Sequence, residues 1–112
     1  MIRCQLVRVS RNRAGKAQRD ASTVSGEPLR IGRGAECDIH LPDPRVSLHH
    51  ASVRRREDGH LYLEAEGGAL QAEGRPEQAR RLLVGMVVGI GPYQLEVEAA
   101  DAGHDFALSV EL

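Results

Sequence analysis

Apolar residues recur at every second position in short runs along most of the chain. Between Ala51 and Leu63, for example, Ala51, Val53, Leu61 and Leu63 alternate with polar neighbours. Such alternation places one side of a segment on a core and is typical of β-strands. The segments with this pattern are 2–9, 29–31, 39–41, 51–53, 61–63, 70–72, 84–90, 93–97 and 106–112.

Turn signals separate these runs. The Asp58-Gly59 pair predicts a β-hairpin, and Gly91-Pro92 predicts a second turn. Asn12 to Ser22 is polar and basic, which predicts a loop. Pro76 to Leu83 is the one helical candidate, but it is short and lacks an apolar stripe. Many short strands with closely spaced turns predict an all-β sandwich.

Composition narrows the function classes. The chain has 112 residues, which is enough for one domain, and a formal net charge of −1. That charge does not favour duplex nucleic acid or an anionic membrane, and three aromatic residues are too few for a base-stacking platform. The longest nearly apolar run, Leu82 to Ile90, is too short to span a membrane. With no apolar signal region at the start, Cys4 and Cys37 are expected as reduced thiols of a cytoplasmic protein.

The order of motifs resembles one family. The segment LRIGRGAECDIHLPDPRVSLHHASV at 29–53, and more weakly LLVGMVVGIGPYQLEV at 82–97, resemble the forkhead-associated (FHA) domain. The residues that match the family pattern in order and spacing are Gly32, Arg33, Asp38, Asp43, Val46, Ser47, His50 and Ala51. The resemblance implies two antiparallel sheets of about eleven strands in total, with the binding loops at one end.

The resemblance also implies a function, because FHA domains bind phosphothreonine in extended peptides. We therefore expect a protein-interaction module rather than an enzyme, with a phosphothreonine-containing or unmodified protein as partner and no cofactor. FHA domains are commonly modules of larger signalling, transcription or secretion proteins. Residues 1–112 are expected to form a single FHA-like domain, and the resemblance leaves open that it is the N-terminal module of a longer protein.

Specific residues carry this expectation. Arg33 follows a glycine at a strand end, where its planar fork suits phosphate oxygens, and Ser47 offers a hydroxyl donor to the same anion. The resemblance makes Gly32 and His50 structural braces of the binding loops. It also places Gly67 and Gly68 at the hydroxyl and asparagine positions of the second binding loop.

The second binding loop departs from the family pattern. Gly67 and Gly68 provide neither a hydroxyl nor an amide side chain, and Leu48 stands where many members carry a donor. Glu64 and Glu66 add negative charge near a site for an anion. Each missing neutral hydrogen bond is worth about 0.5–1.5 kcal/mol, so we expect binding roughly ten- to a thousandfold weaker than that of a full member. Main-chain amides of the glycines offer partial compensation.

Three other interpretations compete with this one. Ser47, His50 and Asp43 are the residue types of a hydrolase triad, but no nucleophile elbow or oxyanion-hole motif accompanies them, so no catalytic residue is predicted. The candidates for a zinc site, Cys37, His40, His49 and His50, lack metal-ligand spacing, so no metal is predicted. The remaining alternative is an FHA-fold adaptor whose contacts do not need phosphate, made through a sheet face or the segment Asn12 to Ser22.

Overall fold

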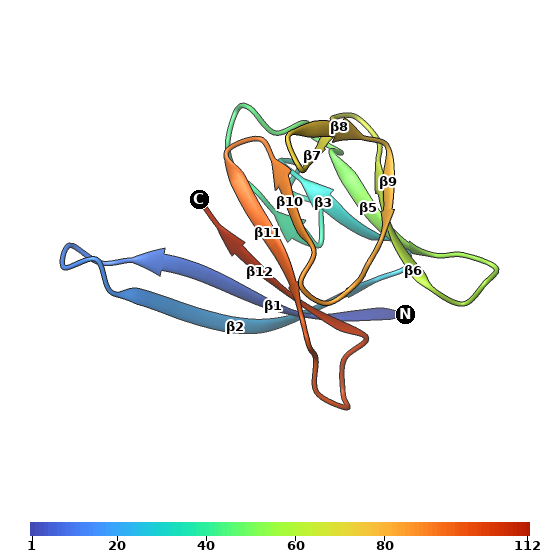
Figure 1. Cartoon of the computed structure of the whole chain (residues 1–112), viewed down its shortest axis with the longest axis horizontal. Helices are drawn as coiled ribbons and strands as arrows, with labels where there is room; N and C mark the ends of the chain where they lie inside the picture. The colour runs from blue at the N-terminus through green and yellow to red at the C-terminus, as the bar shows by residue number, and fades with distance from the viewer.

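The computed structural model describes all residues, 1–112, and consists of strands and connecting loops without a helix. The strands form two sheets of a sandwich, which confirms the predicted fold class (Figure 1). The larger sheet has seven strands in the order β2-β1-β12-β11-β10-β7-β8. Its members are β1 (Ile2–Arg11), β2 (Ala17–Gly26), β7 (Leu70–Ala72), β8 (Arg75–Glu77), β10 (Val87–Ile90), β11 (Tyr93–Glu98) and β12 (Phe106–Glu111).

The smaller sheet has five strands in the order β4-β3-β5-β6-β9. Its members are β3 (Leu29–Gly32), β4 (Ile39–His40), β5 (Ala51–Arg55), β6 (Leu61–Ala65) and β9 (Ala79–Arg81). Both sheets are mixed rather than purely antiparallel, because β1 pairs with β12 and β3 pairs with β4 in parallel. The β1–β12 pair joins the two ends of the chain. These strands are far apart in the sequence, and no tight turn imposes an antiparallel arrangement on them, so they are able to pair in parallel.

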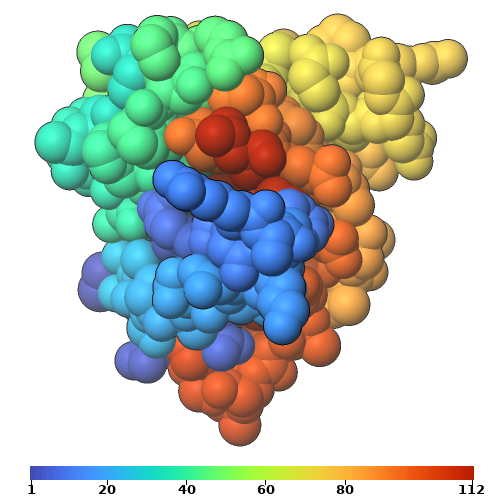
Figure 2. Space-filling model, turned by 90° about the vertical axis from the view of Figure 1, so that its left-hand side faces the viewer, coloured from blue at the N-terminus to red at the C-terminus, as the bar shows by residue number.

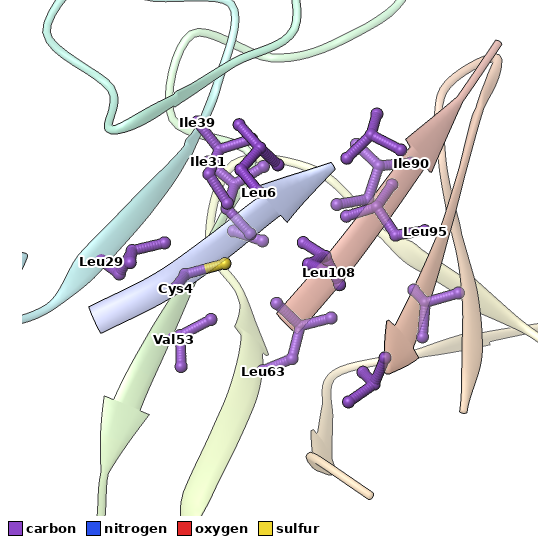
Figure 3. Close-up of a cluster of buried hydrophobic side chains, with 14 of the residues drawn as sticks. Cys4, Leu6, Leu29, Ile31, Ile39, Val53, Leu63, Ile90, Leu95 and Leu108 are labelled. Atoms are coloured by element: carbon purple, nitrogen blue, oxygen red, sulfur yellow. The ribbon is translucent and has the colours of Figure 1, made fainter. Parts of the chain in front are cut away.

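The core is a cluster of 19 buried residues contributed by both sheets. Figure 3 shows Leu29, Ile31 and Val53 of the smaller sheet facing Cys4, Leu6 and Leu108 of the larger one. Burying each such side chain contributes about 1.5–3 kcal/mol. The predicted alternation is the pattern that places these side chains inward.

Two predicted turns are confirmed. Gly59 closes the β5–β6 hairpin with a φ of 82°, and Gly91 closes the β10–β11 hairpin with a φ of 54°. These left-handed conformations are accessible to glycine without steric cost. The β7–β8 hairpin turns at Glu73 and Gly74, whose φ angles of 53° and 75° suit a type I′ turn. Pro76 to Leu83 contributes β8 and β9 and forms no helix.

The expectation of a loop from Asn12 to Ser22 is wrong. β2 pairs with β1 over the register Ile2↔Gly26 to Arg11↔Ala17, so only the tip of this hairpin is a turn. Almost every residue of β2 is exposed, and the strand therefore lacks the apolar alternation that reveals a strand in the sequence. The hairpin extends away from the sandwich in Figure 1, and its tip points toward the viewer in Figure 2. No helix long and apolar enough to cross a membrane occurs in the fold.

Candidate functional site

Three loops are joined at one end of the sandwich, at the top of Figure 1. They are the β3–β4 loop, the β4–β5 loop and the β6–β7 loop. Arg33 N donates to Ser47 O over 3.0 Å, and Gly34 N donates to Leu48 O over 3.1 Å. Gly67 N donates to His49 O over 2.8 Å. Main-chain hydrogen bonds therefore hold the β4–β5 loop between the other two.

Gly32 allows the first two of these loops to approach closely. A Cβ at this position would overlap the carbonyl oxygen of Leu48 and lie 3.0 Å from His50 N. The Gly32 carbonyl also accepts a hydrogen bond from Leu41 N over 2.9 Å. A side chain here would separate the β3–β4 loop from the β4–β5 loop.

Arg33 extends from the end of β3 and is exposed. Its Nε donates to the carbonyl of Val46 over 2.9 Å, which fixes the base of the guanidinium. None of the ion pairs of the protein includes Arg33. Its terminal N–H groups are therefore available to an anion from solvent.

Ser47 lies beside Arg33 on the neighbouring loop and is partly buried. Its hydroxyl donates to the carbonyl of Gly67 over 2.9 Å, and its backbone N–H donates to His50 Nδ1 over 3.1 Å. The hydroxyl must rotate away from Gly67 before it can donate to another acceptor.

His50 connects the second and third loops from the inside. The residue is only 5% exposed, and its Nε2 lies 2.8 Å from the carbonyl oxygen of Ala69. Because Nδ1 accepts the Ser47 N–H, the proton of the neutral ring is on Nε2 and is donated to Ala69. Both ring nitrogens are thus satisfied by backbone groups of two different loops.

Gly67 and Gly68 pack against the β4–β5 loop. A Cβ on Gly67 would lie 2.6 Å from His49 O, and one on Gly68 would overlap the His50 ring. The Gly67 amide is already bonded to His49 O, whereas the Gly68 amide has no hydrogen-bond acceptor. Gly68 therefore offers the only main-chain donor of this pair, and neither position accommodates a larger residue without rearrangement.

The acidic residues near the site are paired. Glu66 accepts from Ser52 Oγ over 2.7 Å and from Arg54 over 3.0 Å, and these contacts hold its pKa below the usual range. Glu64 lies 2.9 Å from Arg56 Nη2. The negative charge expected to repel an anion is thus offset by neighbouring arginines. Leu48, by contrast, is 52% exposed and offers no side-chain donor.

Sequence reasoning could not identify the main-chain partners of this site. The carbonyls of Val46 and Ala69, which hold Arg33 and His50, carry no side-chain signal. Glu36 follows shortly after Arg33 in the same loop, and no sequence motif marks it. Its Oε1 lies 2.8 Å from His49 Nε2, a contact between two loops that only the fold creates.

Comparisons with solved structures agree with this architecture. The FHA domain of the CT664 protein from Chlamydia trachomatis has a TM-score of 0.62 and 23% identity, and the match covers 85% of this chain and 96% of that one. The FHA-2 domain of the Mycobacterium tuberculosis ABC transporter Rv1747 has a TM-score of 0.54 and 28% identity, with coverage of 70% and 71%.

A third similar structure comes from work on phosphothreonine-dependent FHA domain interactions. Its TM-score is 0.62 at 21% identity, with coverage of 85% of this chain and 95% of that one. No curated protein matches the chain. The sequence pattern of the FHA domain, however, matches residues 29–91, which is more than half of the chain. This protein therefore belongs to the FHA domain family.

Proposed function

We propose that this domain binds phosphothreonine peptides through Arg33 and Ser47. The observation that carries the proposal is the Arg33 guanidinium, which is exposed, free of any carboxylate and fixed through Nε beside the loop of Ser47. A planar fork held in this way suits two parallel hydrogen bonds to phosphate oxygens. The similar FHA structure solved in work on phosphothreonine-dependent interactions supports this choice of ligand.

Arg33 is expected to dominate the binding energy. A hydrogen bond to a charged group contributes about 1.5–3 kcal/mol, against about 1 kcal/mol for a neutral one. Ser47 should contribute less than about 1 kcal/mol to binding, because its hydroxyl must give up its hydrogen bond to the Gly67 carbonyl before it donates to phosphate. The Gly68 amide has no acceptor in the protein and is a candidate for a further donor, whereas the Leu48 side chain offers none. Few hydrogen-bond donors therefore contact the charged phosphate, so binding should be weak and sensitive to salt.

The test is fluorescence anisotropy with matched phosphothreonine and unmodified peptide libraries. We expect Arg33→Ala to abolish measurable binding and Ser47→Ala to weaken it. Arg33→Lys keeps the charge but loses the fork, so it should recover only part of the affinity. The control is Arg13→Ala in the hairpin tip, which removes an exposed arginine far along the chain from the site.

The alternative is a phosphate-independent adaptor, and one surface favours it. Leu83, Val84 and Val87 are exposed beside Tyr93 in a groove on the larger sheet. This groove would suit an unmodified partner segment with apolar side chains. If the unmodified peptide binds as well as the phosphorylated one, or if Arg33→Ala leaves the affinity unchanged, the adaptor function replaces the phosphate-dependent one.

The partner is a protein in either case. One similar solved structure is the FhaA FHA domain in complex with the intracellular domain of Rv3910, which supports a protein partner, and a signalling role is part of this proposal. Both cysteines are free, and unpaired thiols are usual in a reducing compartment. We accordingly place the domain in the cytoplasm as part of this proposal, with no nucleic acid, cofactor or inserted membrane segment as partner.

A further inference from the structure

We propose that Glu36, Cys37 and His49 form a binding site for Zn²⁺ beside the Arg33 loop. One carboxylate oxygen, one sulfur and one imidazole nitrogen from these residues all lie within 4.8 Å of one another. Nitrogen, sulfur and carboxylate oxygen are the ligand atoms that zinc selects. This site is independent of the proposed phosphopeptide binding, because it uses none of the same side chains.

Two loops present the three ligands. A turn in which Cys37 N donates to Gly34 O over 3.1 Å places Glu36 and Cys37 at the end of the β3–β4 loop. His49 comes from the β4–β5 loop, and its Nε2 lies 2.8 Å from Glu36 Oε1. The Cys37 thiol donates to the carbonyl of Leu48, the residue before His49, over 3.2 Å. The backbone thus brings the sulfur to the same place as the imidazole.

The separations are compatible with a single metal ion. Bonds of about 2.3 Å to sulfur and about 2.0–2.2 Å to nitrogen and oxygen put tetrahedral ligand atoms roughly 3.3–3.7 Å apart. The observed limit of 4.8 Å requires movements of only about 1 Å. Glu36 and His49 have side chains that are 53% and 49% exposed, so they are able to make such movements. The 2.8 Å contact between them must open slightly as the ion enters.

Burial and charge also suit a cation. Cys37 is 9% exposed, and its thiol donates to the carbonyl of Leu48 over 3.2 Å. A divalent ion would offset the Glu36 carboxylate, replace the thiol proton and leave the fourth position for water. The ion would then clamp the β3–β4 loop to the β4–β5 loop.

Cobalt provides a direct test, because a thiolate bound to Co²⁺ gives a charge-transfer absorption band. Reduced, chelator-treated protein would be titrated with Co²⁺ and then with Zn²⁺. We expect the band to appear with one ion per chain and to disappear as zinc displaces cobalt. Zinc should also raise Tm in a concentration-dependent way, since it binds only the folded protein tightly.

Variants identify the ligands. Cys37→Ser should abolish the band, and His49→Gln should weaken binding by more than the 10- to 100-fold typical of losing an outer-shell partner. The controls are Cys4→Ala and His60→Gln, which remove the other thiol and another exposed histidine and should leave cobalt binding unchanged. A Tm measurement of each metal-free variant separates loss of ligand from loss of fold.

Several results would overturn the site. They are the absence of a charge-transfer band, a band that persists in Cys37→Ser, and a zinc-induced Tm shift of equal size in the folded His49→Gln variant. Arg33→Ala should keep full cobalt binding. Failure of the metal site and failure of the phosphopeptide proposal therefore give different results.

Discussion

Replacing His50 with alanine tests whether one buried ring holds the binding loops together. The substitution removes two contacts, at 3.1 Å to Ser47 N and 2.8 Å to Ala69 O. Because the ring is 5% exposed, it leaves an N–H and a carbonyl without partners inside the protein. Each unsatisfied group costs about 1–3 kcal/mol, so the free energy of unfolding should fall by about 2–6 kcal/mol.

Thermal unfolding followed by circular dichroism measures this loss. For a domain of this size, 1 kcal/mol shifts Tm by roughly 4 °C or more, so His50→Ala should lower Tm by at least about 8 °C. The matched control is His60→Ala, which removes an exposed histidine in the β5–β6 turn and should change stability by less than about 0.5 kcal/mol.

Amide hydrogen exchange adds a local measurement. In the native protein the Ser47 amide is protected by its bond to His50 Nδ1, and in the variant it should exchange faster. The reasoning is refuted if His50→Ala loses no more stability than His60→Ala, or if the Ser47 amide stays equally protected.

Three further substitutions or treatments test neighbouring features. Gly68→Ala places a methyl group against the His50 ring and should destabilise the fold by about 1–3 kcal/mol in thermal unfolding. The hydrogen bond from Ser52 holds the pKa of Glu66 in the folded protein below its unfolded value of about 4.3. The Glu66 carboxylate therefore stabilises the fold fully above that pH, and this stabilisation is lost as the pH falls through the folded-state pKa. Glu66→Gln should make the free energy of unfolding depend less on pH in acid. Burial raises the pKa of Cys4 to about 12, so its thiol should react with iodoacetamide only after unfolding.

Each of these expectations has a control. Gly103→Ala adds a methyl group where the nearest atom is 3.5 Å away and should be nearly neutral, so an equal effect at Gly68 would contradict close packing there. If the native protein and the Glu66→Gln variant have the same acid unfolding curve, the Glu66 carboxylate does not stabilise the fold. Rapid alkylation of Cys4 in the native state would contradict its burial.

The sequence by itself determined the strand architecture and predicts part of the binding site. Alternation from Leu29 to Val53 predicts strands, because side chains on a strand point in turn to opposite faces of the sheet. Asp58-Gly59 predicts a hairpin, because its turn needs positive φ. The FHA resemblance, together with the chemistry of their side chains, predicts that Arg33 and Ser47 bind phosphate, and their contact with phosphate stays a prediction.

The tertiary structure decided what depends on long-range contacts. β2 is a strand because its main chain pairs with β1, although its exposed side chains carry no alternating pattern. Arg33 is fixed by the Val46 carbonyl, and every residue has such a carbonyl, so the sequence cannot single it out. Glu36 and His49 lie in different loops, and no sequence spacing links them. They meet only because main-chain hydrogen bonds between the β3–β4 and β4–β5 loops bring both side chains to one place.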